Sequence, residues 1–337
     1  MKILAIETSC DETAAAIVED QNYRPVLVSN VVASQMAVHA ETGGVIPNIA
    51  ARLHTENLPR VLREATKNGR LDYDAVAVTC GPGLVGCLLI GMSAAKTIAL
   101  AKNIPFYAVN HLEGHIYSAW LGEQVPELPA LVVIVSGGHT ELILMERHGY
   151  YQHLGRTRDD AAGEAFDKVA RLLELGYPGG PILSELATHG DEHTYPLPIA
   201  LNENDSLEFS FSGLKGAVSH LVQKLPQPLA RHTSADIAAS FQYTVSETIK
   251  KKMLRAMHSY PGIQTVCLVG GVAANKHLRK TLEQAVHQNS PQTRFIVPPF
   301  EYCTDNAAMV GAAAVFRHLF GRPDDWRRVQ ADPNLSL

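Results

Sequence analysis

Residues 3–18 read ILAIETSCDETAAAIV, and this stretch decides the fold. Apolar residues 3–6 predict a strand, the polar stretch 8–13 predicts a turn, and residues 14–18 predict a second strand. A similar arrangement, LVVIVSGGHTELILM, returns at residues 131–145, about 130 positions later. Two strand–turn–strand segments with small or polar tips predict a duplicated unit, one copy in each of two lobes.

Strands alternate with helices over the rest of the chain, which predicts an α/β protein. Together with the two hairpins, this outline resembles the two-lobed actin-like ATPase, sugar kinase and heat-shock chaperone (ASKHA) fold, with duplicated RNase H-like lobes. In that superfamily each lobe presents a hairpin tip to phosphate groups. Backbone amides in such turns form concavities that hold anions, although either tip taken alone is also a normal hairpin turn.

Length and composition limit the classes that remain. A chain of 337 residues suffices for two lobes, and 46% hydrophobic with 19% charged residues is typical of a soluble globular protein. The apolar start is too short for a signal peptide, and residues 84–101, interrupted by glycines, serine and lysine, predict a buried helix and not a membrane span. Five scattered cysteines without a C-x-x-C pair favour a reducing cytoplasm and exclude a cysteine zinc site.

The net charge of −5 opposes a polyanion, so contact with nucleic acid would have to be local. Two basic segments are candidates for that contact. A predicted helix over residues 50–70 carries cations at helical spacing, with Glu56 and Glu64 between them: Arg52, Arg60, Arg63 and Lys67. The second candidate is the cluster Lys250, Lys251, Lys252 and Arg255. Both patterns are equally typical of a solvated, salt-bridged helix face.

Three segments are typical of a nucleotide site. Residues 266–269 predict a strand that enters GGVAAN at 270–275, where glycines allow close backbone approach and Asn275 can hold a hydroxyl or ring nitrogen. A helix over 159–175, capped by Thr157, places Asp167 where it could accept two ribose hydroxyls or pair with Arg171. The loop YPGGP at 177–181 suits a ligand wall or a tight connection.

The sequence HLEGH at 111–115 carries the sharpest chemical signal. His111 and His115 fall on one helical face and can share a metal ion. Asp305, just before an apolar helix over 307–320, is the candidate third ligand, although Thr304 or Asp305 could instead cap that helix. Glu113 lies two residues from each histidine and so points away from both, which argues against an H-E-x-x-H protease.

Taken together, these segments resemble the TsaD family of tRNA threonylcarbamoyladenosine transferases, once labelled sialoglycoproteases. The resemblance runs nearly end to end and rests on ordered motifs: IETSCDET at 6–13, GPGL at 81–84, HLEGH at 111–115, VSGGHT at 135–140, GEAFDK at 163–168, FSFSGLK at 209–215, GGVAAN at 270–275 and CTDN at 303–306. One departure is Asn48 in GVIPN, where the family pattern leads us to expect Glu; no carboxylate role is therefore assigned to this position.

The resemblance implies a set of site residues. It implies iron, or alternatively zinc, held by His111, His115 and Asp305, with Asp11 and Glu12 in the reactive cleft. The adenylate substrate is implied to lie against Ile134, Val135, Ser136, Gly137, Gly138, Asp167, Gly180 and Asn275. We expect an N-terminal lobe of residues 1–128 plus 306–337 and a C-terminal lobe of residues 129–305, with the metal and nucleotide cleft between them.

The implied reaction transfers threonylcarbamoyl from threonylcarbamoyl-AMP to the exocyclic amine of the adenosine 3′ of the anticodon in tRNAs that read ANN codons, releasing AMP. Asp11 is the expected proton acceptor, assisted or replaced by Glu12. A cytoplasmic location, a paralogue-like partner subunit (TsaB type) and a small ATPase (TsaE type) are also implied. Fold alone leaves two alternatives open: an ATPase or sugar kinase of the same superfamily, and a non-enzymatic nucleotide-binding subunit.

Overall fold

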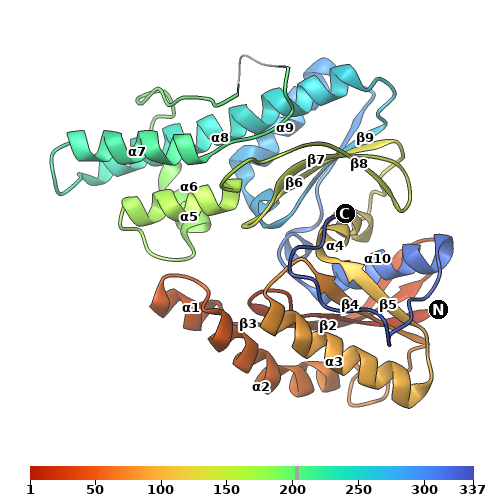
Figure 1. Ribbon diagram of the computed structural model, residues 1–337. Helices are drawn as coiled ribbons and strands as arrows, with labels where there is room; N and C mark the ends of the chain where they lie inside the picture. Colours follow the sequence, from red (N-terminus) through yellow and green to blue (C-terminus); the bar gives the residue numbers. More distant parts are fainter. Residues whose placement is uncertain (202–204) are drawn as a thin grey trace. The chain divides into compact units, whose positions relative to one another are not determined.

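The computed structural model describes residues 1–201 and 205–337. The chain forms two compact units: unit 1 comprises Met1–Val125 and Pro298–Leu337, and unit 2 comprises Pro126–Val297. Figure 1 shows a sheet with helices packed on it in each unit.

Unit 1 is built on a five-stranded sheet in the order β3-β2-β1-β4-β5. The first three strands form an antiparallel meander, and β4 and β5 run parallel to β1. The predicted strands at 3–6 and 14–18 are present and extend further in both directions. The elements are β1 (Lys2–Glu7), β2 (Glu12–Asp20), β3 (Pro25–Ser34), α1 (Met36–Thr42), α2 (Pro47–Ala65), β4 (Ala75–Gly81), α3 (Val85–Lys102), β5 (Phe106–Asn110), α4 (His111–Ser118), η1 (Ala119–Leu121), η3 (Phe300–Tyr302) and α10 (Ala307–Phe320).

Helices cover both faces of this sheet. Successive side chains of a strand point to opposite faces, so the strand residues that a helix contacts show which face it covers. A Cβ added to Gly311 of α10 would lie 2.4 Å from a methyl group of Val18 and 3.3 Å from Ala5, so α10 packs on the face that carries these two residues. A Cβ added to Gly91 of α3 would lie 3.3 Å from Val78 and 3.5 Å from Ile6, so α3 packs on the opposite face. Both faces are therefore apolar, which explains the continuous hydrophobic run of β1.

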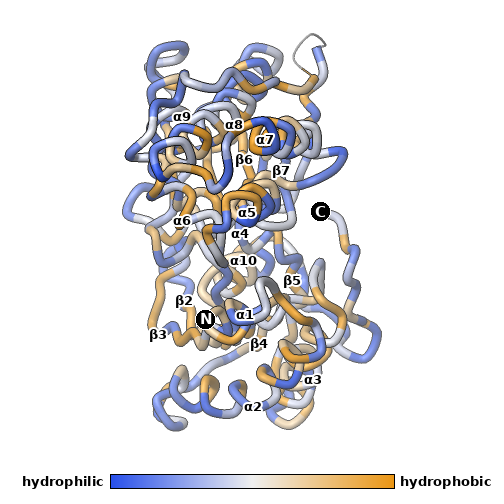
Figure 2. Tube along the Cα trace, turned by 90° about the vertical axis from the view of Figure 1, so that its left-hand side faces the viewer, coloured by the Kyte–Doolittle hydropathy of each residue, from blue (hydrophilic) through white to orange (hydrophobic). Residues whose placement is uncertain are grey.

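Helix α3 is the one helix among the described residues that is long and apolar enough to cross a membrane by length and composition. Its hydrophobic colour is clear in Figure 2. Met92, Ala95 and Ala99 pack into the core of unit 1, but only 33% of the helix is buried, and Val85 and Leu100 are exposed. The prediction of a buried helix is therefore correct for one face only.

Unit 2 repeats the topology of unit 1. Its sheet has the order β10-β9-β6-β7-β8, with an antiparallel β6–β7–β8 meander and with β9 and β10 parallel to β6. This correspondence confirms the duplicated strand–turn–strand unit predicted from the sequence. The elements are β6 (Ala130–Val135), β7 (Thr140–Arg147), β8 (Tyr150–Arg156), α5 (Ala162–Leu172), α6 (Gly179–Ala187), α7 (Ser212–Lys224), α8 (Arg231–Ser259), β9 (Thr265–Val269), η2 (Gly271–Ala274), α9 (Lys276–Asn289) and β10 (Arg294–Ile296).

Two local predictions in unit 2 were wrong. Helix α5 begins at Ala162, and Thr157 does not cap it. The Thr157 N–H donates to the carbonyl of Thr140 and its hydroxyl donates to the carbonyl of Asp160, while the Ala162 N–H donates to the Thr140 hydroxyl. The segment 177–181 is not a loop throughout: Pro178 is the N-cap of α6, which starts at Gly179. In both cases tertiary hydrogen bonds, which the local sequence does not reveal, set the helix start.

Several cations of the two basic segments are engaged within the fold. On α2, which ends at Ala65 and not at 70, Arg52 pairs with Glu56 and Arg60 pairs with Glu64. On α8, Lys250 pairs with Glu247, and buried Lys252 donates to the backbone carbonyls of Leu201 and Ser206. These contacts fit the salt-bridged interpretation of both segments better than a continuous polyanion-binding face.

Candidate functional site

The histidine pair lies on α4, directly after β5. The side chain of Asn110 caps this helix by accepting from the Leu112 N–H, so the helix starts at the end of a buried strand. One helical turn separates His111 from His115, and their ring centroids are 4.7 Å apart. Glu113 points elsewhere, with a carboxylate oxygen 3.8 Å from Arg317, as the helical geometry predicted.

Asp305 approaches both imidazoles from a segment almost 200 residues away. Its Oδ1 lies 3.5 Å from Nε2 of His111 and 3.3 Å from Nε2 of His115. The residue that caps α10 is Asn306, whose side chain accepts from the Met309 N–H. Asp305 is therefore not needed as a cap, and the capping alternative for Thr304 and Asp305 was wrong.

The donor set suits a divalent transition metal. One ligand atom from each of these three side chains lies within 4.8 Å of the others. His115 is 1% exposed, and among the residues that the structure describes neither of its ring nitrogens forms a hydrogen bond; Nε2 has the Asp305 carboxylate at 3.3 Å, a contact without hydrogen-bond geometry. A buried imidazole that forms no hydrogen bond is costly, and coordination of a metal would satisfy it. Two histidines and one carboxylate are typical ligands of non-haem iron and of catalytic zinc.

The acidic surroundings favour a cation at this position. Burial alone would lower the pKa of His111, but the carboxylates of Asp305 and Glu7 outweigh it and raise the pKa to about 9. Burial, together with the charges of Asp305 and Asp11, raises the pKa of Glu12 to about 10. A metal ion would offset this accumulation of negative charge.

Asp11 and Glu12, the predicted catalytic pair, lie where the β1–β2 turn passes into β2. The backbone carbonyl of Asp11 accepts from the Gln35 N–H, and a carboxylate oxygen of Glu12 accepts from the Ser34 hydroxyl at 3.2 Å. Because the Asp305 charge acts on Glu12, these residues belong to the same electrostatic site as the histidine pair.

In unit 2, the β6–β7 tip is bounded by backbone on two sides. Ile134 and Val135 end the buried strand β6, and a Cβ at Gly137 or Gly138 would meet nothing within 4 Å. A Cβ at Gly163, in the first turn of α5, would lie 2.6 Å from the Ser136 carbonyl, and one at Gly270 would lie 2.5 Å from the Val135 carbonyl. Three segments, the tip, the start of α5 and the GGVAAN loop, therefore meet closely at the end of β6. The exposed amides of such a turn suit a phosphate.

Asp167 and Asn275 are already engaged in the structure of unit 2. Oδ1 of Asp167 accepts from the N–H groups of Gly179 and Gly180 at 2.9 and 3.2 Å. Asn275 caps α9 through Oδ1 and donates from Nδ2 to Ser184 and Gln242. Both side chains form hydrogen bonds to residues of α6, so they hold this helix in place beside the elements that carry them.

Sequence reasoning missed several residues that build these sites. In unit 1, Glu7 and Ser9 lie beside Nδ1 of His111, and Thr79 donates to Glu7; in unit 2, Gly163 brings α5 against the tip. Glu7 did carry a signal, because a carboxylate that directly follows the apolar run 3–6 must find partners when the strand is buried.

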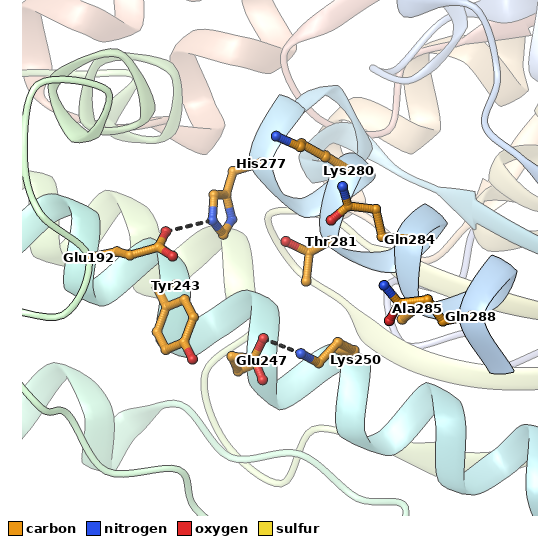
Figure 3. A pocket seen from close by; sticks show the side chains of 10 residues that line it. All are labelled: Glu192, Tyr243, Glu247, Lys250, His277, Lys280, Thr281, Gln284, Ala285 and Gln288. Carbon is orange, nitrogen blue, oxygen red and sulfur yellow. Dashed lines mark hydrogen bonds and ion pairs between the residues drawn. The ribbon is translucent and has the colours of Figure 1, made fainter.

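A separate hollow of about 340 Å³ lies between α8 and α9 (Figure 3). None of the predicted site residues lines it. Two ion pairs lie at its wall: Glu192 with His277 at 3.1 Å, and Glu247 with Lys250, three residues apart on α8.

Known proteins match the chain over nearly its whole length. The family model for TsaD, tRNA N6-adenosine threonylcarbamoyltransferase, matches residues 26–312. A protein of that name from a Synechococcus species is 50% identical over 328 residues, covering 95% of this chain and 88% of its own. Another from Caldicellulosiruptor saccharolyticus is 48% identical over 340 residues, covering 100% and 98%. A third from Bacillus cereus is 49% identical over 338 residues, covering 99% and 96%.

Solved structures support the fold alone. Full-length HypF in a phosphate- and nucleotide-bound form superposes with a TM-score of 0.63 at 15% identity, covering 95% of this chain and 47% of HypF. Component A of (R)-2-hydroxyglutaryl-CoA dehydratase from Acidaminococcus fermentans gives 0.52 at 16% identity, covering 94% and 97%. These neighbours are ASKHA-like, as the duplicated sheets predicted.

The extent of the family match and the identity to three named relatives decide between the alternatives that the fold leaves open. The chain belongs to the TsaD family, the tRNA N6-adenosine threonylcarbamoyltransferases, and its activity is the modification of tRNA adenosine.

Proposed function

We propose that the chain transfers the threonylcarbamoyl group of threonylcarbamoyl-AMP to the exocyclic amine of the adenosine 3′ of the anticodon, in tRNAs that read ANN codons. The donor is a mixed anhydride. The amine nitrogen forms a bond to the carbamoyl carbon, the bond from that carbon to the phosphate oxygen breaks, and AMP leaves with the bonding electron pair. One proton leaves the amine.

The observation that carries this proposal is the convergence of His111, His115 and Asp305, with His115 buried and without a hydrogen-bond partner in the described part of the chain. We assign these side chains as metal ligands and iron as the preferred ion, with zinc as the alternative, because two imidazoles and one carboxylate suit both. When bound, the ion would supply Lewis-acid polarisation of the threonylcarbamoyl group.

The adenylate portion is assigned to unit 2. The open backbone at Gly137 and Gly138 would donate amide hydrogens to phosphate oxygens, which become more negative as AMP departs. Asp167 and Asn275 hold α6 and α9 around the remainder of the nucleotide, with Gly180 at the start of α6.

Proton removal is assigned to Asp11, assisted or replaced by Glu12. Asp11 is preferred because the raised pKa of Glu12, about 10, keeps that carboxyl protonated near neutral pH, and a protonated carboxyl cannot accept a proton. A carboxylate held by the β1–β2 turn can accept the proton that the amine loses as its bond to carbon forms. Asp11→Asn keeps the size of the side chain and removes its basicity. A full single-turnover rate in this variant at saturating substrate would exclude the assignment.

We further infer a cytoplasmic enzyme that acts with a paralogue-like subunit of the TsaB type and a small ATPase of the TsaE type. The tRNA substrate follows from the family, and the net charge of −5 supports a need for partners that strengthen its binding. Adding these partners is therefore one arm of the test below.

The test measures AMP release and the mass of tRNA nucleosides after incubation with threonylcarbamoyl-AMP and unmodified tRNA. We expect one threonylcarbamoyladenosine per AMP with the wild-type chain plus partners, and a loss of both signals in His111→Ala. AMP release without modified nucleoside would indicate simple hydrolysis and would contradict the transferase proposal. Metal analysis of protein purified without chelator, with His111→Ala beside it, identifies the ion.

A further inference from the structure

Glu7 is the last residue of β1 and is fully buried in unit 1. A carboxylate in such a place must be satisfied by hydrogen bonds or by an opposite charge. The proposed reaction assigns it no role. The contacts of the Glu7 carboxylate show what it does in the fold.

Both oxygens of Glu7 have partners. Oε1 accepts from the Ser9 backbone N–H at 2.5 Å, and Oε2 accepts from the Thr79 hydroxyl at 2.5 Å. Oε2 also lies 3.4 Å from Nδ1 of His111. The carboxylate is thus fixed between two strands and faces a predicted metal ligand.

The two nitrogens of His111 face different environments. Nδ1 faces β1, where the Ser9 hydroxyl lies at 3.1 Å and Glu7 at 3.4 Å. Nε2 faces Asp305 at 3.5 Å. In contrast, Nδ1 of His115 has no hydrogen-bond partner within the described ranges. The two histidines therefore differ at Nδ1: that of His111 faces a hydrogen-bonded carboxylate and a hydroxyl, and that of His115 forms no hydrogen bond to a described residue.

We propose that Glu7 is a positioning residue of the metal centre. It accepts the Nδ1–H of His111, fixes the ring orientation, and selects the tautomer whose Nε2 lone pair points at the ion; Ser9 supports the same nitrogen. This inference rests on the proposed metal site. Carboxylate–histidine–metal arrangements of this kind raise ligand basicity, and loss of the carboxylate typically weakens metal binding about 10–100-fold.

The first experiment compares Glu7→Gln with Thr79→Val, and it needs neither tRNA nor threonylcarbamoyl-AMP. Both variants remove one partner from the same buried network, but only Glu7→Gln replaces the acceptor for His111 with an amide that can present N–H groups to it. Dissociation constants for Zn²⁺ and Co²⁺ are measured by competition with a chromogenic chelator, and folding is checked by circular dichroism.

We expect about 10–100-fold weaker binding and an altered Co²⁺ absorption spectrum in Glu7→Gln, with a change below about threefold in Thr79→Val. Equal weakening in both folded variants, or wild-type affinity in Glu7→Gln, would overturn the proposal. If the wild-type chain itself fails to bind Zn²⁺ or Co²⁺, the proposed metal centre fails first, so the two failures are distinguishable.

A second measurement keeps the proposal testable if Glu7→Gln does not fold. Zn²⁺-loaded wild-type protein with ¹⁵N-labelled histidine is compared by NMR with His111→Gln, which assigns the His111 signals. We expect a protonated Nδ1 with a downfield hydrogen-bonded proton and a metal-bound Nε2. A metal-bound Nδ1, or no hydrogen-bonded proton on that nitrogen, would contradict the assignment.

Discussion

The β1–β2 tip of unit 1 and the β6–β7 tip of unit 2 occupy equivalent positions in sheets of the same strand order, but they are built differently. Thr8 and Ser9 in the first tip are buried at 1% exposure, and their hydroxyls bond to neighbouring elements. Gly137 and Gly138 in the second tip are exposed, with open space where a Cβ would lie. One topology thus supports a site made of side chains in one unit and a site made of backbone in the other.

Carboxylates show the same division of roles. In unit 1, Asp305 and Glu7 face imidazoles and create a centre for a cation. In unit 2, Asp159 and Asp167 accept backbone N–H groups and fix the course of the chain around the tip. The comparison predicts that substitutions in unit 1 change metal content, while substitutions in unit 2 change stability and nucleotide affinity.

The largest expected effect is the loss of metal in Asp305→Ala. Removing the carboxylate leaves two imidazoles without an anionic ligand. Loss of a residue that only supports a metal ligand typically weakens metal binding about 10–100-fold, and loss of the ligand Asp305 should weaken it at least as much. Glu113→Gln is the matched control, because that carboxylate lies on the same helix as the histidines but near Arg317. Metal content by mass spectrometry checks both, and equal losses would show that α4 folding, not ligation, controls binding.

The tip of unit 2 is tested with two glycine substitutions. In Gly163→Ala the new Cβ would lie 2.6 Å from the Ser136 carbonyl, and we expect a stability loss of about 1–3 kcal/mol from overpacking. In Gly137→Ala the Cβ meets nothing, so stability should change by less than about 0.5 kcal/mol while AMP affinity falls. Thermal unfolding and calorimetric titration with AMP separate the two; unchanged AMP affinity in Gly137→Ala would remove the tip from the adenylate site.

A smaller, pH-dependent effect is expected for Asp159→Asn. Burial opposes ionisation, but hydrogen bonds from the Ser210 hydroxyl and the Phe211 and Ser212 N–H groups outweigh it and lower the pKa of Asp159. A folded-state pKa below the unfolded value stabilises the fold above the unfolded pKa, and this stability is lost as pH falls through the folded pKa. Asp159→Asn should therefore be less stable than wild type near pH 7, by about 1 kcal/mol for weakened hydrogen bonds, and should approach it below about pH 4. Denaturant unfolding at several pH values measures this, and a constant difference at all pH values would exclude the charge as its cause.

The smallest effect is expected for Arg60→Ala on α2. Arg60 and Glu64 form an exposed i,i+4 pair with side-chain exposures of 50% and 48%, and such pairs contribute about 0.3–0.5 kcal/mol. Stability and tRNA affinity should both remain close to wild type. A tRNA affinity that drops and recovers at low salt would instead identify α2 as part of the tRNA-binding surface.

Local pattern was sufficient for much of the fold. The apolar runs around 3–18 and 131–145 predicted both hairpins, because a buried strand needs apolar residues and its turn needs small or polar ones. His111 and His115 could be paired for the same kind of reason, since four positions bring side chains together on any α-helix. The starts of α5 and α6 could not be predicted in this way. Their first N–H groups donate to the side chains of Thr140 and Asp167, which lie outside the local segments.

By itself, the sequence determined the duplicated α/β topology, the histidine face of α4 and, through its ordered motifs, the family. Only the tertiary structure decided that Asp305 lies 3.3 Å from His115, that Asn306 and not Asp305 caps α10, and that Glu7 faces His111. The physical reason is the distance along the chain over which each kind of interaction acts. Periodicity and turn chemistry act over a few residues, whereas a buried charge or an imidazole is satisfied by whichever distant segment the packed core brings within hydrogen-bond reach.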